Sequence, residues 1–289
     1  MKIPLTLGLA FFASALFAQT DKIKDYHLNK EYKMNSAGTL KLKCSDARVF
    51  ISGSDRSTAH VKIDRVVETK GLLFSSHDEF RVDVEEVDGN LEIIENKSSH
   101  MAGIVGYYRE NYTITVEIPK GASLDVDGDD GDYKVSNLAG TISINLDDAD
   151  VELTHCSGSD FRFVVDDGDI TMDGGRGNLD IDADDADVKI SGGAFTSITA
   201  DMDDGDLIIE TSLAENGNYR ITAQDGLVAL TIPNGGGKFD IRHDDANVLT
   251  EGEFVIMEES ENRTQLSLAK GTALVDIRAD DARVRLINR

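Results

Sequence analysis

The chain has 289 residues, and its 54 aspartates and glutamates outnumber its 29 lysines and arginines, which gives a formal net charge of -25. A surface of this charge repels nucleic acids and anionic lipids, which excludes both as partners, and it attracts cations. The chain has no tryptophan and only 3 prolines, but 26 glycines. After the first segment, apolar residues alternate with a period of two and show no helical period. We therefore predict an all-β fold.

Residues 1–18, MKIPLTLGLAFFASALFA, carry one positive charge at Lys2, then an apolar run, then small residues before Gln19. This segment is too short for a membrane span and is followed by polar residues, a pattern typical of a secretory signal peptide. We predict cleavage after Ala18, with cleavage after Ala15 as the alternative. No later stretch approaches spanning length. We therefore expect no transmembrane segment after signal removal, and an exported protein that is periplasmic, on the outer surface or secreted.

Residues 19–39 are predicted to be a lead segment, and residues 40–289 a repeat domain that is most regular over 112–250. Between Leu124 and Glu210 one sequence motif occurs five times. It contains two aspartates, then a glycine or alanine at its centre, then a third aspartate. The copies are LDVDGDDGDYKV, ISINLDDADVEL, FRFVVDDGDITM, LDIDADDADVKI and ITADMDDGDLII, centred on Gly131, Ala149, Gly168, Ala186 and Gly205. The centres are 18 or 19 residues apart. A unit this short cannot bury its own apolar face, so the copies must stack.

Each copy places apolar residues seven, five and three positions before its centre and two and four positions after it. In one copy these residues are Ile142, Ile144, Leu146, Val151 and Leu153. The same template predicts five further centres, at Ala47, Gly89, Gly226, Ala246 and Ala282. The wider gaps predict a degenerate copy within each of 61–71, 112–121 and 253–271. Segments 70–79 and 96–110 lack the pattern and are predicted to be excursions from one side of the rod.

Each coil is expected to run strand, tight turn, strand, loop. Aspartate can hydrogen-bond its own downstream backbone, and glycine tolerates the positive φ that such turns often need. Alanine at half of the centres indicates that not every turn has a positive φ. A coil of 18–21 residues has room for two short strands and two turns, so we predict a parallel β-helix or β-roll-like solenoid. The chain ends within a copy, and we expect Arg283, Arg285 and Arg289 to close one end of the rod.

If the coils stack in register, their aspartates form files along one side with like charges about 4.8 Å apart. Each neighbouring pair then costs about 1 kcal/mol in water. Calcium accepts several carboxylate and carbonyl oxygens, so a column of divalent-cation sites is one interpretation. The favoured interpretation is a row of solvated turn residues, with no cofactor required. The candidate metal ligands are Asp130, Asp132, Asp148, Asp150, Asp167, Asp169, Asp185, Asp187, Asp204 and Asp206.

Catalysis receives little support from the sequence. A paired-carboxylate hydrolase needs two acids in different environments, whereas these acids are repeated in near-identical settings. His243 is the only histidine in the acidic turns, and its inward phase indicates a packed side chain rather than a general base. Cys44 and Cys156 are predicted to be free thiols without a chemical role. We predict that the protein is not an enzyme.

The segment VEIPKGASLDV, residues 116–126, followed by turns centred on Asp-Gly-Asp or Asp-Ala-Asp, resembles the putative-adhesin families of bacterial envelope proteins. Their repeat typically reads Ser-Gly-Asp-Val. Here aspartate replaces the serine at Asp130, Asp167 and Asp204, and alanine often replaces the glycine. The resemblance covers Leu40–Arg289 and implies a β-helical fold on the exported side of the envelope.

The resemblance and the composition together predict a non-catalytic β-solenoid that serves as a binding or structural module of the bacterial cell envelope, with an adhesive role as one version. Its partner would be an envelope or surface component that the sequence does not identify. The alternative is an envelope signalling accessory protein. The second alternative is a calcium-dependent, glycan-active β-helix enzyme.

Overall fold

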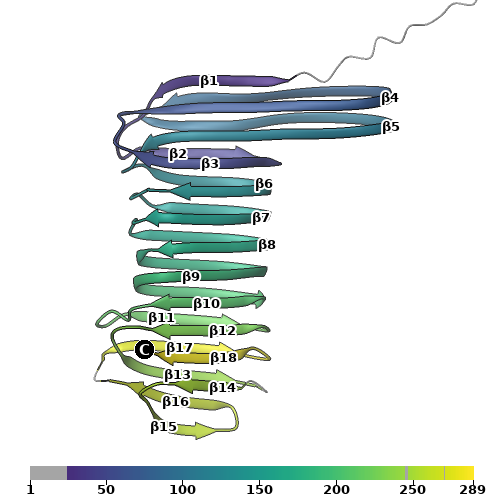
Figure 1. The fold of residues 1–289 in the computed structure, drawn as a ribbon. Helices are drawn as coiled ribbons and strands as arrows, with labels where there is room; N and C mark the ends of the chain where they lie inside the picture. Colours follow the sequence, from purple (N-terminus) through teal and green to yellow (C-terminus); the bar gives the residue numbers. More distant parts are fainter. Residues whose placement is uncertain (1–24, 245–246, 270) are drawn as a thin grey trace, which may run out of the picture.

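The computed structural model describes residues 25–289 apart from 245, 246 and 270, and only the backbone of 69–78 and 98–106. The predicted signal peptide and the first part of the lead segment lie outside the described residues. The described chain is all-β, so it contains no helix that could cross a membrane. Its strands stack into a slim solenoid, with one long arm near the N-terminal end (Figure 1). The predicted fold class is confirmed.

The strands are numbered in chain order, and several of the longest contain both straight parts of a coil and the bend between them. The first nine are β1 Tyr26–Lys33, β2 Thr39–Cys44, β3 Ala47–Ser54, β4 Thr58–Val87, β5 Asn90–Pro119, β6 Ser123–Ser136, β7 Ile142–Cys156, β8 Asp160–Gly174 and β9 Arg176–Asp204. The others are β10 Asp206–Thr211, β11 Asn218–Ala223, β12 Leu227–Ile232, β13 Gly237–His243, β14 Val248–Glu251, β15 Phe254–Ser260, β16 Arg263–Leu268, β17 Ala273–Ala279 and β18 Arg283–Asn288.

The central coils, β6 to β9, pair in parallel and in register. Leu124 pairs with Ile142, Ile142 with Phe161, and Phe161 with Leu179. Each of these steps is 18 or 19 residues, so one copy of the repeat is one turn of the solenoid. The stacking inferred from the repeat is therefore present, and equivalent residues of successive copies are lateral neighbours.

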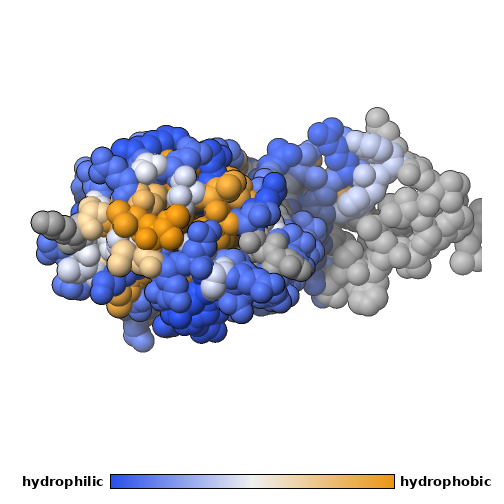
Figure 2. All heavy atoms as spheres, turned by 90° about the horizontal axis from the view of Figure 1, so that it is seen from below, coloured by the Kyte–Doolittle hydropathy of each residue, from blue (hydrophilic) through white to orange (hydrophobic). Residues whose placement is uncertain are grey.

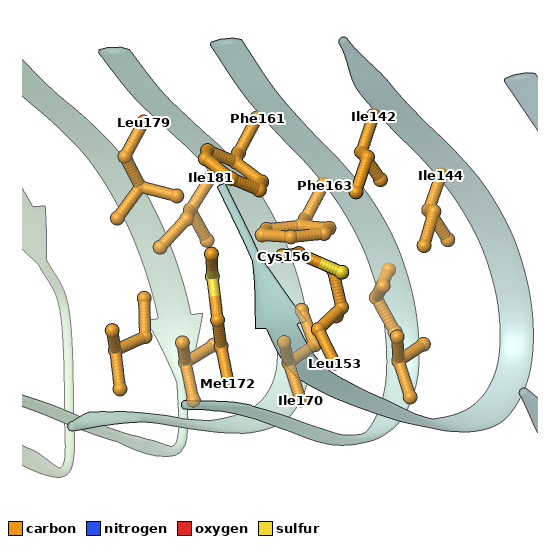
Figure 3. Packing of buried hydrophobic residues seen from close by; sticks show 14 of the residues in the cluster. Ile142, Ile144, Leu153, Cys156, Phe161, Phe163, Ile170, Met172, Leu179 and Ile181 are labelled. Carbon is orange, nitrogen blue, oxygen red and sulfur yellow. The ribbon is translucent and has the colours of Figure 1, made fainter. Parts of the chain in front are cut away.

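The core is a continuous strip between the two sheets of the solenoid, and the inward positions of the template fill it. Figure 3 shows Phe161 and Phe163 on one sheet facing Ile170 and Met172 on the other. Phe161 also packs edge-on against Phe195 of the following coil, with 6.2 Å between the ring centroids. One connected cluster of buried residues extends from the first strands to the last.

Both cysteines are free and buried in this core. Burial raises the pKa of Cys44 to about 12, so its thiol stays protonated at neutral pH. Burial also raises the pKa of Cys156. Because the thiolate is the reactive form, the structure assigns both side chains a packing role.

Gly89 is not the centre of a coil, as the repeat template predicted. Asp88 and Gly89, with φ of 49° and 82°, form the tight turn of an antiparallel hairpin in which Val87 pairs with Asn90. Two successive residues with positive φ suit the twist of a hairpin. Glu86, which the template placed inward, is exposed. The alternation of a hairpin strand imitates that of a coil, because both have a period of two.

The same hairpin produces the arm. Residues 60–87 of β4 pair antiparallel with residues 90–117 of β5, and the predicted excursions 70–79 and 96–110 lie mostly within its projecting part (Figure 1). Residues 61–71 are not a degenerate coil, because β4 is antiparallel to both β1 and β5. Residues 113–119, by contrast, pair in parallel with β3, as expected of a solenoid strand.

The order of coils along the rod differs from their order in the chain. The coil centred on Ala47 lies between β5 and β6, where Leu40 pairs with both Leu91 and Leu124. The last coil, β17 and β18, is inserted between two earlier coils, because Val275 pairs with both Tyr219 and Phe239. The expectation that arginines of the last copy close the rod is therefore wrong. Arg285 lies on an inner strand and forms an ion pair with Glu251 at 2.5 Å.

The rod ends instead at β14 and at the antiparallel hairpin of β15 and β16. Residues 253–271 were predicted to contain a degenerate coil in which Phe254 and Ile256 face Leu266 and Leu268 across an acidic turn. Phe254 does pair with Leu268 and Ile256 with Leu266, but in an antiparallel hairpin rather than in a coil. The hairpin reverses the chain, which allows the next strand to return to the interior of the stack. The predicted centre at Ala246 lies outside the described residues, and its flanking strands are β13 and β14.

Candidate functional site

The bends of successive coils bring the predicted aspartates together along one side of the solenoid. Asp130 pairs with Asp148, Asp148 with Asp167, and Asp167 with Asp185. Asp46 extends this file, because Ala47 pairs with Gly131. We call the ten predicted ligand residues the aspartate column. Nine of them are exposed and Asp206 is half-buried.

The bends of the column come in pairs in which an alanine-centred coil precedes a glycine-centred one. Gly131 packs against the Ala47 carbonyl, Gly168 against that of Ala149, and Gly205 against that of Ala186. In each case a Cβ on the glycine would overlap the neighbouring carbonyl oxygen. These glycines have φ of 130°, 117° and 115°, a region that side chains disfavour. The alternation of glycine and alanine in the sequence thus corresponds to two bend geometries, one with a positive φ at its centre and one without.

Some carboxylates of the column stabilise the bends directly. The backbone N–H of Asp169 donates to Asp150 Oδ1 at 3.1 Å, and the N–H of Asp206 donates to Asp187 Oδ1 at 2.7 Å. In both pairs the acceptor belongs to an alanine-centred bend and the donor to the glycine-centred bend after it. A charged acceptor strengthens such a hydrogen bond. These aspartates therefore have a structural role that requires no ligand.

Like charges in neighbouring coils repel one another. Partial desolvation, together with the charges of Asp46 and Asp148, raises the pKa of Asp130. Desolvation and the charges of Asp166 and Asp203 likewise raise the pKa of Asp184. Within the part of the chain that the structure describes, no group of three or more His, Cys, Asp or Glu side chains is arranged to hold a metal ion. The geometry can attract cations along its length without surrounding one.

Asp130→Asn is expected to raise the melting temperature at pH 7. The folded state raises the pKa of Asp130 above its unfolded value, so ionisation of this group disfavours folding. That cost is fully present above the folded pKa and disappears as the pH falls below the unfolded value of about 3.9. The gain from the substitution should therefore shrink on acidification, as measured by thermal unfolding across pH.

Asp160→Asn is the matched control, and its expected effect on the melting temperature is opposite to that of Asp130→Asn. Hydrogen bonds from Ser159 and Asn178 lower the pKa of the half-buried Asp160. Its contribution to stability is present above the unfolded pKa and is lost as the pH falls through the folded one. The substitution should lower the melting temperature at pH 7. Equal effects of the two substitutions would contradict the repulsion inferred for the column.

The column begins beside a polar concavity of about 430 Å³, at the junction between the solenoid and the base of the arm. It is lined by Asp46, Ala47, Arg48, Glu110, Asn111, Tyr112, Thr113, Gly131, Asp132, Asp148, Ala149 and Asp150. The repeat predicted the column residues of this site but not the residues that β5 contributes. Residues 96–110 lacked the repeat, so nothing in the pattern indicated that Glu110 would lie beside Asp46.

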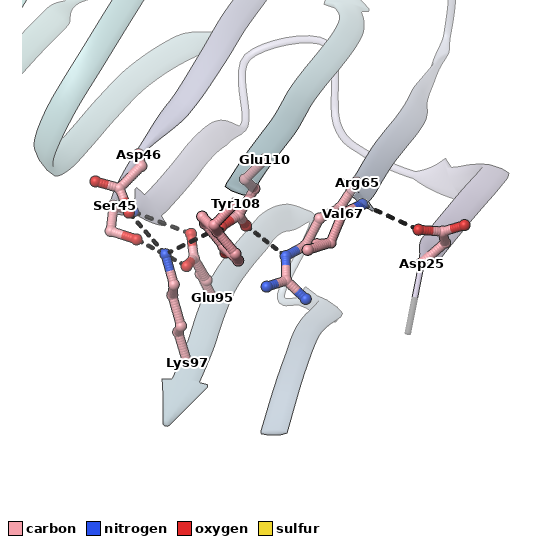
Figure 4. Close-up of polar contacts among 9 residues, drawn as sticks. All are labelled: Asp25, Ser45, Asp46, Arg65, Val67, Glu95, Lys97, Tyr108 and Glu110. Carbon is pink, nitrogen blue, oxygen red and sulfur yellow. Dashed lines mark hydrogen bonds and ion pairs between the residues drawn. The ribbon is translucent and has the colours of Figure 1, made fainter. Parts of the chain in front are cut away.

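A network of ion pairs joins the arm to the first coil at this concavity (Figure 4). Lys97 Nζ lies 2.7 Å from Asp46 Oδ2, and this hydrogen bond holds the pKa of Asp46 below its usual value. Glu110 receives hydrogen bonds from Arg65 Nε and Tyr108, each at 2.5 Å. Ser45 donates to Glu95 through its hydroxyl at 2.8 Å and through its backbone N–H at 3.0 Å. These residues come from β4, β5 and the bend between β2 and β3.

A sequence model of the Toastrack DUF4097 family matches residues 37–285, which is most of the chain. This protein belongs to the Toastrack DUF4097 family. The match agrees with the stacked solenoid and, at the level of the family, with the resemblance drawn from the repeats. No curated protein matches the Toastrack chain.

Two solved structures are similar to this Toastrack protein. One is described as a putative adhesin from Bacteroides fragilis NCTC 9343, with 9% identity, 90% of this chain and 97% of that chain covered, and a TM-score of 0.45. The other is described as a putative cell adhesion protein from Clostridium sporogenes ATCC 15579, with 14% identity, 92% and 100% covered, and a TM-score of 0.29.

His243 of the Toastrack chain lies at a second concavity, of about 400 Å³, which contains no residue of the aspartate column. Its ring is half-buried, and Nε2 lies 3.2 Å from the Thr264 hydroxyl on β16. The same concavity contains Arg242, Arg263 and Arg278, and Arg263 makes two hydrogen bonds to Asp240. The histidine is thus held against the hairpin at the end of the solenoid, in agreement with the packed role predicted for it.

Proposed function

We propose that this Toastrack protein is an exported, non-catalytic binding or structural module of the bacterial cell envelope. The observation that carries the proposal is the single core that extends from the first strands to the last. A stack with one continuous core is a rigid scaffold, because each coil is held by its neighbours on both sides. Such a scaffold displays its bends, arm and terminal strand at set positions, which suits recognition of a large partner rather than of a small substrate.

The proposal is tested by expressing the full chain, with its own leader and a C-terminal tag, in a bacterial host. We expect processing of the leader, recovery outside the cytoplasm, and a reproducible cross-link to an envelope component. Full-length protein that stays in the cytoplasm would contradict export. Hydrolysis of a carbohydrate panel that is lost in His243→Ala would contradict a non-catalytic role.

We further propose that the aspartate column holds divalent cations loosely along its length. The support is the in-register stacking of carboxylates and the raised pKa values of Asp130 and Asp184. When cations reduce the repulsion between carboxylates without being coordinated, their stabilising effect depends on their charge rather than on their size. Calcium and magnesium should therefore raise the melting temperature by similar small amounts, and chelator should reverse both shifts. A rise with calcium at concentrations where magnesium does little would instead indicate coordinating sites.

A further inference from the structure

The rod ends on a strand with a free edge. In the described part of the chain, β15 pairs only with β16, and β14 only with β18. The outer edge of β15 therefore presents unpaired backbone N–H and C=O groups. Proteins usually protect such an edge with charged side chains, proline or a covering segment, because it is a template for another strand.

The first half of β15 lacks this protection. Val255, Ile256 and Met257 are 57%, 57% and 67% exposed, and Leu249 on the neighbouring β14 is 60% exposed. Viewed from this end of the rod, Figure 2 shows an apolar region framed by hydrophilic residues. A contiguous apolar surface with a polar rim is typical of an interaction site.

The opposite end of the solenoid is closed differently. Its edge strand β1 exposes charged or polar side chains at Asn29, Lys30 and Lys33. Its aromatic residues turn inward, where Phe80 packs edge-on against both Tyr26 and Tyr112. In the described residues both ends carry an edge strand with a single partner, but only the β15 end exposes a run of large apolar side chains. This difference sets the β15 end apart from the β1 end.

The charges around β15 indicate what it binds. Glu253, Glu258, Glu259 and Glu261 are exposed, and none of them lies within 4 Å of a lysine or arginine nitrogen in the described residues. The nearby Arg263 makes two hydrogen bonds to Asp240, and its charge also interacts with that of Glu258, which leaves Glu253, Glu259 and Glu261 without a cationic neighbour of this kind in the described residues. The edge is therefore apolar at its centre and acidic on both sides, so a complementary strand is apolar at its centre and basic at its ends.

We propose that the outer edge of β15 binds an extended segment of another protein, apolar at its centre and flanked by lysine or arginine, which adds to the sheet as a further strand. This inference rests on the proposed binding role and names the surface and the partner's chemistry. Backbone hydrogen bonds hold such a strand, and its side chains give specificity. A second copy fits less well, because antiparallel pairing of the two apolar stretches places Glu253 opposite Glu258 of the other copy, and like charges in that position repel.

The probe is a fluorescent peptide, Lys-Lys-Val-Thr-Val-Thr-Val-Lys-Lys, titrated with the mature protein and followed by anisotropy. We expect saturable binding that weakens about tenfold or more in Met257→Lys and in Glu258→Lys, since tenfold corresponds to about 1.4 kcal/mol. Leu274→Lys is the matched control. Leu274 is also 57% exposed, but β17 is paired on both of its edges. Binding to that variant should equal binding to the wild type.

Two further peptides separate strand addition from simple charge attraction by the aspartate column. A peptide with glutamates in place of its lysines, and one with alternate backbone nitrogens methylated, should both fail to bind. Equal binding of the methylated peptide, or undiminished binding to Met257→Lys, would overturn the proposal. The proposal would also be overturned if the protein alone formed a dimer and Met257→Lys abolished that dimer. The occupant of the β15 edge would then be a second copy of the chain. If the envelope cross-link described above persists in Met257→Lys, the proposed binding function would still hold, but the β15 edge would not be the surface that provides it.

Discussion

Arg65→Met is expected to lower the free energy of unfolding by about 3–5 kcal/mol, because it breaks a buried ion pair by removing one partner. Arg65 is only 1% exposed, its Nε lies 2.5 Å from Glu110 Oε1, and its guanidinium carbon lies 4.2 Å from the centroid of the Phe80 ring. The substitution leaves Glu110 partly desolvated and removes the cation–π contact as well. Urea unfolding of the two proteins measures the difference.

The loss should depend on pH. Burial acts to raise the pKa of Glu110, but hydrogen bonds from Arg65 and Tyr108 outweigh it and hold this pKa below the usual value. The stabilisation is therefore present above the unfolded pKa of about 4.3 and is lost as the pH falls through the folded pKa. The difference between Arg65→Met and the wild type should narrow in acid.

Arg48→Met is the control for charge alone. Arg48 lines the same concavity as Glu110, but its side chain is 72% exposed and its Nε lies 3.6 Å from Asp132 Oδ2. Exposed ion pairs contribute at most about 1 kcal/mol, so this variant should unfold close to the wild type. If the two arginine variants were equally stable, the network at the base of the arm would not be what fixes the arm to the solenoid.

Gly168→Ala is expected to lower the free energy of unfolding by about 2–5 kcal/mol, from strain at a disfavoured φ and from overpacking. The residue has a φ of 117°, and an added Cβ would overlap the carbonyl oxygen of Ala149. Relief requires separation of two coils that are paired along both sheets, so the clash cannot relax locally. The same denaturation experiment measures the loss.

Gly192→Ala separates the cost of backbone strain from the cost of overpacking. Gly192 also has a positive φ, of 67°, but no heavy atom lies within 4 Å of the position that a Cβ would take. Only the backbone cost of about 1 kcal/mol remains there. A loss in Gly168→Ala no larger than in Gly192→Ala would show that the bends of the column tolerate separation, contrary to the close packing of the glycine and alanine bends.

The repeating part of this protein could be predicted from the sequence because its signals are local. Alternation with a period of two, set against the glycine or alanine centres, placed Ile142, Phe163 and Leu153 in the core, and all three are buried. It also placed Asp130 beside Asp148. It failed at Gly89, where a hairpin turn carries the same aspartate, glycine and alternating flanks as a coil.

The sequence by itself determined the phase of the coils, the inward residues and the acidic bends, because each of these depends on neighbours within one copy. Only the tertiary structure decided which copies are neighbours. Every coil offers the same hydrogen-bonding edges at the same phase, so periodicity cannot tell that the last coil lies between β12 and β14. The antiparallel hairpins decide it by reversing the chain. They place Arg65 in the interior of the arm's base and leave β15 at the open end of the rod.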